Sequence, residues 1–280
     1  MRLTRVFSEQ RLELGIEFTL DSEISQHLLK VMRLRPGQEF TAFDNSGAEF
    51  LCSFKGSIQA KRGQLQARAE VVQKRFPQVE LPGSLRVFCA IVKGERFDWL
   101  VEKLTELGVS EIVPLQTEFT QVFGPADNKQ ERWQRLAIKA SCQSGRVRVP
   151  KVSQPCGFVE AVRDCSGRSE GSERAVSGRE YSANFERSGI VEATGQVPCQ
   201  VANFLFTAQA QSWPELAVYE YVGCKTSNIF IGPEGGFSSQ ELELAREQNF
   251  KLASLGRSIL RVETAALAAA VLVINSCWNS

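Results

Sequence analysis

Two glycine-containing turns near the end of the chain constrain its fold more than any other feature. The first reads IGPEGGF from Ile231 to Phe237, and the second reads LGRSILRVETA from Leu255 to Ala265. Each follows an apolar stretch typical of a strand and precedes a helical pattern. Because open α/β sheets bind ligands at the carboxyl ends of their strands, the turns predict a ligand site formed by neighbouring loops.

Alternating strands and helices after residue 84 indicate the same fold class. The stretch Leu85–Val92 is almost continuously apolar, as in a parallel sheet that is covered on both faces. In Phe97–Leu107 the apolar residues recur at helical spacing, and Gly108 follows where a helix C-cap belongs. Further strands are expected at 111–115, 201–207, 227–231 and 250–255, and further helices at 131–142 and 263–275. We therefore predict an α/β domain over residues 76–280.

Residues 1–75 have the pattern of a small β-rich domain. Stretches 40–44 and 48–54 flank Asn45–Gly47, whose residue types tolerate positive φ, so a hairpin is predicted. A strand at 64–73 and a helix at 22–32 complete the expected small barrel. Its basic residues form either a phosphate-binding patch or an ordinary solvated surface. These residues are Arg2, Arg5, Lys30, Arg33, Arg35, Lys61 and Arg62.

A polar segment interrupts the α/β pattern between about residues 165 and 200. Ser, Gly, Arg and Glu dominate it, so it buries too little apolar surface to offset the entropy of ordering. We interpret it as an inserted, mobile loop. The alternative is an arginine-rich arm that touches RNA, although the glutamates of the segment offset its arginines.

Composition excludes several classes of chemistry. Lys and Arg number 33 against 32 Asp and Glu, so affinity for nucleic acid depends on local clustering of charge. The eight cysteines form no C-x-x-C pair, and the only histidine is His27, which excludes simple metal sites and histidine triads. Free thiols in a reducing cytosol are expected. The chain has no apolar signal region at its start, and its apolar run 265–274 is too short to cross a bilayer, so we expect a cytoplasmic protein.

Four motifs in this order resemble the RsmE family of 16S ribosomal RNA uridine methyltransferases. They are KLTELGV from Lys103, QSGR ending at Arg146, IGPEGGF from Ile231 and ILRVETA from Ile259. Arg2, Arg5, Phe7 and the stretch 27–33 extend the resemblance to the amino terminus. It covers nearly the whole chain, apart from the insert at about 165–200.

The resemblance implies a fold, a reaction and partners. The expected fold is a PUA-like amino-terminal β-barrel joined to a SPOUT-type methyltransferase domain with a C-terminal trefoil knot, which chain periodicity cannot reveal. The expected cofactor is S-adenosylmethionine, and the expected acceptor is N3 of a uridine in 16S ribosomal RNA of the small ribosomal subunit. A homodimer is expected, without a metal and without a membrane.

Three loops would hold the cofactor. The glycines let the main chain approach a ligand, although the first turn alone is also consistent with a simple tight turn. The implied cofactor residues are Phe206, Thr207, Ile231, Gly232, Pro233, Gly235, Gly236, Leu255, Gly256, Ile259, Leu260 and Thr264. We hypothesise that Arg261 stabilises the developing uridine anion, and that Glu263 or Glu234 orients groups or accepts the N3 proton.

RNA would be contacted by Arg2, Arg5 and Arg33, and by Arg146 unless Arg146 instead caps a helix or pairs with a carboxylate. Three departures from the family pattern are Phe119 in place of an arginine, the basic Lys139, and Val262 in place of a threonine. Two alternatives stay open at this point. One is a non-catalytic RNA-binding factor for ribosome assembly, and the other is a methyltransferase of another RNA.

Overall fold

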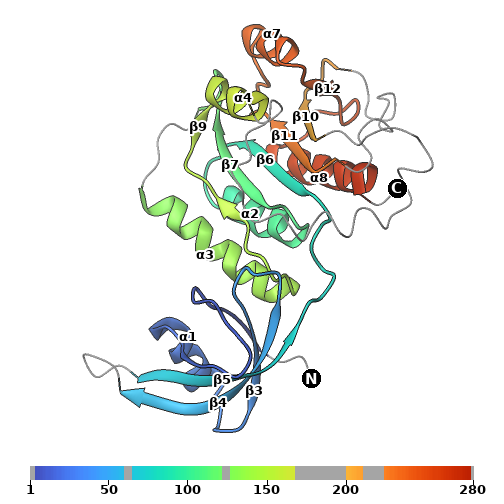
Figure 1. Cartoon of the computed structure of the whole chain (residues 1–280). Coiled ribbons are helices and arrows are strands. Elements are labelled where there is room, and N and C mark those ends of the chain that lie inside the picture. Colours follow the sequence, from blue (N-terminus) through green and yellow to red (C-terminus); the bar gives the residue numbers. More distant parts are fainter. Residues whose placement is uncertain (1–3, 60–64, 122–126, 168–199, 211–223, 279–280) are drawn as a thin grey trace, which may run out of the picture. The chain divides into compact units, whose positions relative to one another are not determined.

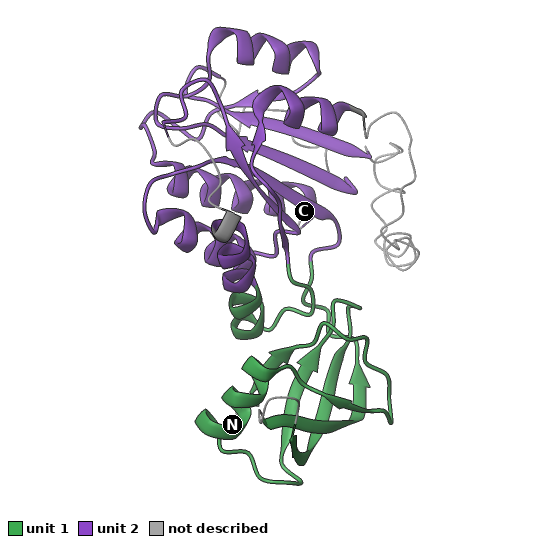
Figure 2. Cartoon of the chain, turned by 90° about the vertical axis from the view of Figure 1, so that its left-hand side faces the viewer, with its two compact units in different colours: residues 1–80, 138–149 green, residues 81–137, 150–280 purple. Residues whose placement is uncertain are grey.

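The computed structural model describes residues 4–59, 65–121, 127–167, 200–210 and 224–278 (Figure 1). The chain forms two compact units, of which unit 1 contains residues 1–80 and 138–149 and unit 2 contains residues 81–137 and 150–280 (Figure 2). The boundary falls inside one helix, α3 (Asp127–Ser144). Residues 138–149 were expected in the second domain, but in the structure they cluster with unit 1.

Unit 1 is built on a five-stranded sheet in the order β1-β3-β4-β5-β2. Its elements are β1 (Arg5–Phe7), β2 (Glu17–Thr19), α1 (Ser22–Gln26), the π-helical η1 (His27–Val31), β3 (Glu39–Phe43), β4 (Glu49–Gln59) and β5 (Leu65–Arg75). The predicted hairpin is confirmed, because β3 and β4 pair in antiparallel register around a turn in which Asn45 has φ 64°. The predicted helix at 22–32 is confirmed as α1 and η1. The short strands β1 and β2 were not predicted.

The core of unit 1 lies between the sheet and α1. Phe40, Phe50 and Phe54 are almost completely buried there, and Leu28 of η1 packs into the same cluster. The first six residues of β4 alternate between half-buried and buried, as expected for a strand with one face on the core. Burying several phenylalanine side chains gives this small unit a substantial apolar core.

Unit 2 contains a parallel sheet in the order β12-β10-β11-β6-β7-β8, with β9 paired to β7. Its strands are β6 (Ser84–Ala90), β7 (Glu111–Gln116), β8 (Lys151–Val152), β9 (Cys156–Gly157), β10 (Val201–Phe206), β11 (Thr226–Ile231) and β12 (Lys251–Ala253). Its helices are α2 (Arg96–Glu106), part of α3, α4 (Phe158–Gly167), α7 (Ser239–Glu247) and α8 (Val262–Trp278). The predicted α/β class and parallel sheet are confirmed. The knot stays a prediction.

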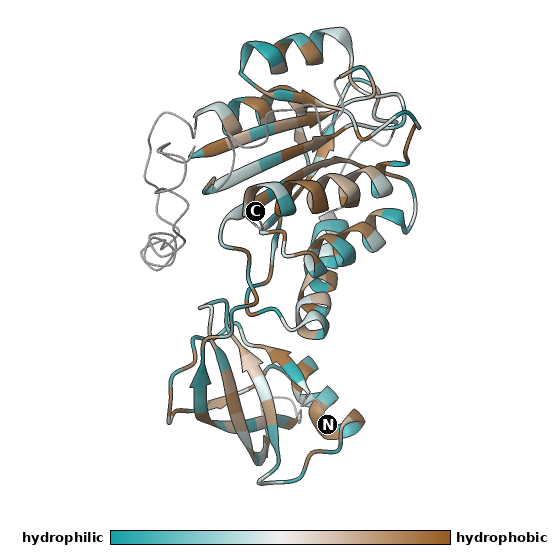
Figure 3. Ribbon diagram, turned by 90° about the vertical axis from the view of Figure 1, so that its right-hand side faces the viewer, coloured by the Kyte–Doolittle hydropathy of each residue, from teal (hydrophilic) through white to brown (hydrophobic). Residues whose placement is uncertain are grey.

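Helices cover the sheet of unit 2 on both faces. Helix α8 is apolar along most of its length (Figure 3) and packs against α2, β6 and β11. On the other face, α4 packs against α7 and β7, over a cluster in which the rings of Phe88 and Phe230 stack with centroids 4.3 Å apart. Because both faces are covered, the central strands carry apolar residues at almost every position. The strand predicted at 85–92 is confirmed for this reason.

A buried ion-pair network lies at the amino-terminal ends of the strands. The guanidinium of Arg86, which is 5% exposed, donates to Glu111 on β7 at 2.7 Å and to Asp164 on α4 at 2.8 Å. The other carboxylate oxygen of Glu111 accepts from Ser153 at 2.6 Å. The network thereby joins α4 to the sheet. Residues 164–167 belong to α4, so the predicted loop is wrong for residues 165–167, and its remaining residues 168–199 lie outside the described residues.

The expectation of free thiols is confirmed for Cys52, Cys89, Cys142, Cys156, Cys165 and Cys277. It is wrong for Cys224, which is disulfide-bonded. Spacing along the chain does not reveal which residues meet after folding, so this pairing escaped the sequence analysis. Cys199 lies outside the described residues.

Candidate active site

A pocket lies at the carboxyl ends of β10, β11 and β12 in unit 2. The loops that follow these strands form its walls, because parallel strands present their carboxyl ends at one edge of the sheet. The lining residues are Phe206, Thr207, Ala208, Gln209, Ile231, Gly232, Pro233, Glu234, Gly235, Gly236, Phe237, Ser254, Leu255, Gly256, Ser258, Ile259, Leu260, Val262 and Ala265. All the predicted cofactor residues except Thr264 are among them. Thr264 is exposed in the first turn of α8.

Two glycines set the path of the pocket's main chain. A Cβ on Gly232 would lie 3.0 Å from the ring of Phe237 and 3.2 Å from the main chain of Gly236, so a larger residue forces the loop to move. Gly256 has φ +123°, which L-residues rarely adopt. The Ser254 hydroxyl donates to Gly256 O at 3.1 Å and accepts from Gly256 N–H at 3.3 Å, which holds the second turn in place. The pocket therefore presents main chain rather than bulky side chains at these points.

The three predicted catalytic residues have different surroundings. Glu234 lines the pocket and is exposed. Arg261 is also exposed, has no ion-pair partner among the described residues, and lies next to the pocket residues Leu260 and Val262 in the chain. Glu263 is only 8% exposed and lies outside the lining, in the first turn of α8. The structure thus gathers all three near the pocket and buries only Glu263.

Arg96, which the sequence analysis missed, connects two of these carboxylates. Its Nη1 atom lies 3.5 Å from Oε1 of Glu234 and 3.9 Å from Oε1 of Glu263. Arg96 begins α2, shortly after the carboxyl end of β6. Since the strand-end rule applies to β6 as well as to its neighbours, it would have identified this arginine.

The carboxylate of Glu263 has spare capacity for hydrogen bonding. Its Oε2 atom is buried and has no hydrogen-bond partner among the described residues. Burial raises the pKa of the neighbouring Cys89 thiol, and the Glu263 charge raises it further. Buried polar atoms without partners are rare in folded proteins, so this oxygen is available to an ordered water or to a ligand.

A second buried carboxylate, Glu241, fixes the loop on the other side of the pocket. Ser238 and Glu241 form a capping box, as their S-x-x-E spacing indicates: Oε2 of Glu241 accepts from Ser238 N–H at 2.9 Å, and the Ser238 hydroxyl accepts from Glu241 N–H at 3.3 Å. Its Oε1 atom also accepts from the main-chain N–H of Glu118 at 3.0 Å. Glu241 therefore ties the loop after β7 to the start of α7.

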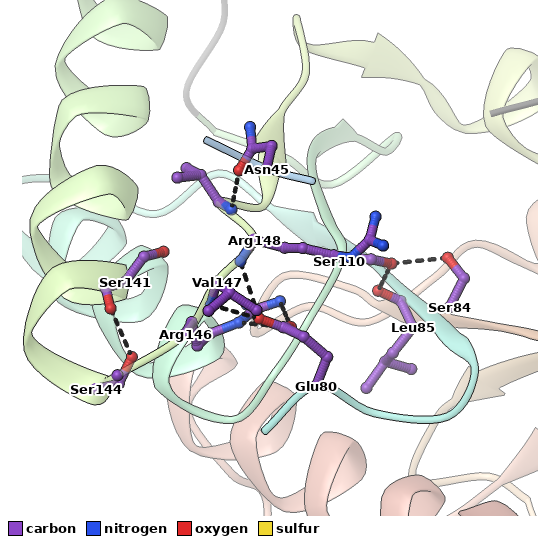
Figure 4. Close-up of polar contacts among 12 residues, drawn as sticks. Asn45, Glu80, Ser84, Leu85, Ser110, Ser141, Ser144, Arg146, Val147 and Arg148 are labelled. Carbon is purple, nitrogen blue, oxygen red and sulfur yellow. Dashed lines mark hydrogen bonds and ion pairs between the residues drawn. The ribbon is translucent and has the colours of Figure 1, made fainter. Parts of the chain in front are cut away.

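The predicted RNA-binding arginines of unit 1 differ in exposure. Arg146 is 5% exposed and pairs with Glu80 at 2.7 Å, and Glu80 also accepts from the main-chain N–H groups of Val147 and Arg148 (Figure 4). Arg5 is similarly enclosed, since it pairs with Glu49 and donates to Arg146 O at 2.9 Å. For Arg146 the structure shows the alternative of pairing with a carboxylate.

Arg33, by contrast, is exposed and has φ 52°. Its neighbours Lys30 and Arg35 are exposed as well, whereas Arg2, Lys61 and Arg62 lie outside the described residues. Among the described residues there is no group of side chains suited to a metal ion. No helix in the described part of the chain is long and apolar enough to cross a membrane.

Comparison with known proteins identifies the family. A family model described as an RNA methyltransferase domain matches residues 79–274, and a second, described as an RNA methyltransferase PUA domain, matches residues 20–64. The chain belongs to the RNA methyltransferase family. Both matches agree with the expected RsmE resemblance and with a PUA-like amino-terminal domain.

Named relatives and solved structures narrow the similarity. The Ribosomal RNA small subunit methyltransferase E of Bacillus subtilis is 28% identical over 265 residues, which cover 93% of this chain and 90% of the relative. The crystal structure of the Neisseria gonorrhoeae Ribosomal RNA small subunit methyltransferase E, bound to S-adenosyl methionine, is 26% identical with a TM-score of 0.75, covering 99% of this chain and 98% of that one. A Legionella pneumophila protein in complex with the bound cofactor SAM is 28% identical with a TM-score of 0.74, again covering 99% and 98%.

Proposed function

We propose that this RNA methyltransferase transfers a methyl group from S-adenosylmethionine to N3 of a uridine in 16S ribosomal RNA of the small ribosomal subunit. The observation that most directly supports this proposal is the pocket formed by the loops after β10, β11 and β12. It lies in a chain that matches a cofactor-bound relative over 99% of its length. The pocket also argues against the non-catalytic assembly factor, because such a protein has no need of this main-chain cradle.

The residues of the pocket fit the cofactor. Phe206, Ile231 and Leu255 offer apolar surface for a planar adenine, and the main chain around Gly232 and Gly256 offers polar groups at close range. A side chain at Gly232 would clash with Phe237 and the main chain of Gly236 and so distort the loop that lines the pocket. When bound, S-adenosylmethionine supplies an activated methyl group on its sulfonium, so the protein need only position the acceptor and manage charge.

The charged residues beside the pocket stabilise the developing negative charge, accept the proton and position the proton acceptor. N3 of uridine loses a proton as it gains the methyl group, and negative charge develops on the neighbouring carbonyl oxygens. Arg261 donates hydrogen bonds to one of these oxygens, because it is exposed and has no described ion-pair partner. Glu234 lines the pocket and accepts the proton. Glu263 and Arg96 hold Glu234 in place through the Arg96 guanidinium.

Unit 1 binds the RNA through backbone phosphates. Lys30, Arg33 and Arg35 are exposed within one short segment, whereas Arg5 and Arg146 stabilise unit 1 through buried ion pairs. Exposed cations neutralise phosphates without reading sequence. Uridine selection then falls to unit 2.

The active assembly is a homodimer in the cytoplasm. The alanine-rich helix α8 does not by itself account for a dimer, because Ala266, Ala269 and Ala270 are fully buried within the chain. Light scattering of the purified protein tests this part of the proposal, and a monomer that methylates normally would contradict it.

Mass-mapped methylation of 16S RNA tests the proposed reaction. RNA from cells that lack this protein is compared with RNA from complemented cells. We expect one uridine to lose a base methyl group in the former and regain it in the latter. If 16S RNA is unchanged but another RNA from the cells that lack the protein has lost a methylated base, the alternative of a methyltransferase acting on another RNA is favoured.

Calorimetry with S-adenosylmethionine tests the alternative of a non-catalytic assembly factor. That alternative predicts no binding of the cofactor.

A further inference from the structure

Phe119 is an exposed aromatic residue at the edge of the cofactor pocket. It follows β7 in unit 2 and is 45% exposed. A Cβ placed on Gly235, which lines the pocket, would lie 3.3 Å from Cβ and 3.6 Å from Cγ of Phe119. The phenylalanine therefore lies directly against the glycine loop, and part of its side chain remains open to solvent.

The turn that carries Phe119 is held rigidly. The main-chain N–H of Thr117 donates to the Thr120 hydroxyl at 2.9 Å, and Thr120 N–H donates to Thr117 O at 3.1 Å. The two threonine hydroxyls also lie 2.9 Å apart, and both residues are buried. Phe119 thus projects from a turn whose two ends are fixed.

Glu241 fixes this turn relative to the pocket. Its carboxylate accepts from Glu118 N–H with one oxygen and from Ser238 N–H with the other. Ser238 follows the glycine loop, so one buried carboxylate connects the turn of Phe119 to the segment that leaves the pocket. An apolar side chain held in a fixed position at the edge of a binding site is preorganised for a planar ligand.

We infer that Phe119 forms the base subsite of the enzyme, where the unstacked target uracil lies against the phenylalanine ring beside the methyl donor. The inference rests on the proposed function and adds the contact that holds the acceptor base. Proteins that read single-stranded RNA commonly stack unpaired bases on aromatic side chains. Stacking orients the ring plane but does not distinguish uracil from other bases, so Arg261 and Glu234 provide the discrimination at the ring edge.

Substitutions at Phe119 separate stacking from simple packing. Phe119→Tyr keeps an aromatic face, Phe119→Leu keeps apolar bulk against Gly235 without that face, and Phe119→Ala removes both. Two quantities are measured for each variant. The first is the methylation of small subunits that lack the methyl group, and the second is the affinity for a short fluorescent oligouridylate and for an oligonucleotide of the same length without bases. Trp99→Leu is the matched control, because Trp99 on α2 in unit 2 is also 45% exposed but is not among the nearest neighbours of a Cβ on Gly235.

We expect Phe119→Tyr to behave like the wild type. Phe119→Leu and Phe119→Ala should both lose about ten- to hundredfold in kcat/KM and in oligouridylate affinity, the range that stacking of one base provides. Abasic binding, S-adenosylmethionine affinity and thermal stability should stay unchanged in all three variants, and Trp99→Leu should lose nothing.

Several outcomes would overturn the inference. These are wild-type behaviour of Phe119→Leu, an equal loss in Trp99→Leu, or a loss of abasic binding that matches the loss for oligouridylate. If the wild type fails to methylate small subunits, the proposed function fails. The oligouridylate comparison still decides whether Phe119 binds a base.

Discussion

Glu241 and Glu263 occupy equivalent positions in α7 and α8, the helices that follow two of the three pocket loops, but their surroundings differ. Each lies in the first turn of a helix, and each is almost buried, at 9% and 8% exposed. Both oxygens of Glu241 accept main-chain hydrogen bonds, whereas one oxygen of Glu263 has no described partner and the other lies 3.9 Å from Arg96. The contrast is between a carboxylate whose two oxygens both accept main-chain hydrogen bonds and one whose Oε2 is open to a further partner, and our proposal gives only the second a part in the reaction.

The largest expected effect concerns Arg261, which lies in the loop of Glu263. Arg261→Ala should lower kcat by about 10²- to 10³-fold, as removal of one preorganised donor to a developing anion typically does. The affinity for S-adenosylmethionine should stay measurable by calorimetry, because Arg261 does not line the pocket. Near-normal turnover would contradict its role.

Isosteric amide variants test the two carboxylates directly. Glu241→Gln places an amide NH₂ against a main-chain N–H donor, so the free energy of unfolding should fall by about 2 kcal/mol. Glu263→Gln removes no hydrogen bond from Oε2, so its stability should change by less than about 1 kcal/mol while methylation falls. Urea unfolding and methylation assays on both proteins measure these values. Equal destabilisation by the two substitutions would remove the contrast.

Two glycine variants compare the role of the main chain within the first loop. Gly232→Ala brings a methyl group within 3.2 Å of the backbone of Gly236, whereas the nearest neighbour of a methyl group at Gly235 is the side chain of Phe119 at 3.3 Å. Gly232→Ala should therefore weaken S-adenosylmethionine binding about tenfold or more, which corresponds to about 1.4 kcal/mol. Gly235→Ala serves as the control and should lose less, as calorimetry will show. A larger loss in Gly235→Ala would contradict the assignment.

The smallest expected change in stability concerns Glu111, which we compare with Glu241 and Glu263. Glu111 is a paired carboxylate at the amino-terminal end of β7, whereas the pocket lies at the carboxyl ends of the strands. Burial raises the pKa of Glu111, but the Ser153 hydrogen bond and the Arg86 charge outweigh it, so the net pKa lies below the ordinary 4.5. A lowered folded pKa adds stability above the unfolded pKa, and this stability is lost as pH falls through the folded value. Glu111→Gln should therefore be less stable than wild type at pH 7, and the gap should narrow below about pH 4.5. Urea midpoints across this range measure the gap, and a gap that widens in acid would be inconsistent with the pairing.

Sequence patterns predicted the elements that carry strong periodicity or turn chemistry. The strand at 85–92, the helix at 97–107 and the Ser238–Glu241 capping box follow from local rules, and the strand-end rule located the pocket. Short strands such as β8 and β9 have too few residues to show a period. Helix α4 precedes the polar insert in the sequence. Because the last residues of α4 have the same polar composition as the insert, the sequence did not indicate that the last turn is helical.

Contacts between distant segments were beyond the reach of the sequence. Nothing near Glu118 indicates that its N–H binds a carboxylate 123 positions away, and nothing near Arg96 indicates that it lies between Glu234 and Glu263. The same holds for Arg146, whose motif is consistent with either an exposed anion site or the buried pair with Glu80 that the structure shows. Such pairings depend on the packed fold rather than on local preference.

The pocket's reliance on main chain also has an evolutionary consequence. The pocket is formed largely by main-chain groups, with glycines at the few points where a side chain would clash. The identity of most other residues around it therefore matters little for binding. Sequences are then free to diverge while the fold that carries the pocket persists, and the TM-score of 0.75 at 26% identity shows such divergence for the fold as a whole. If Phe119 holds the acceptor base as we propose, a change at this edge position would alter how the acceptor is held without loss of the donor site.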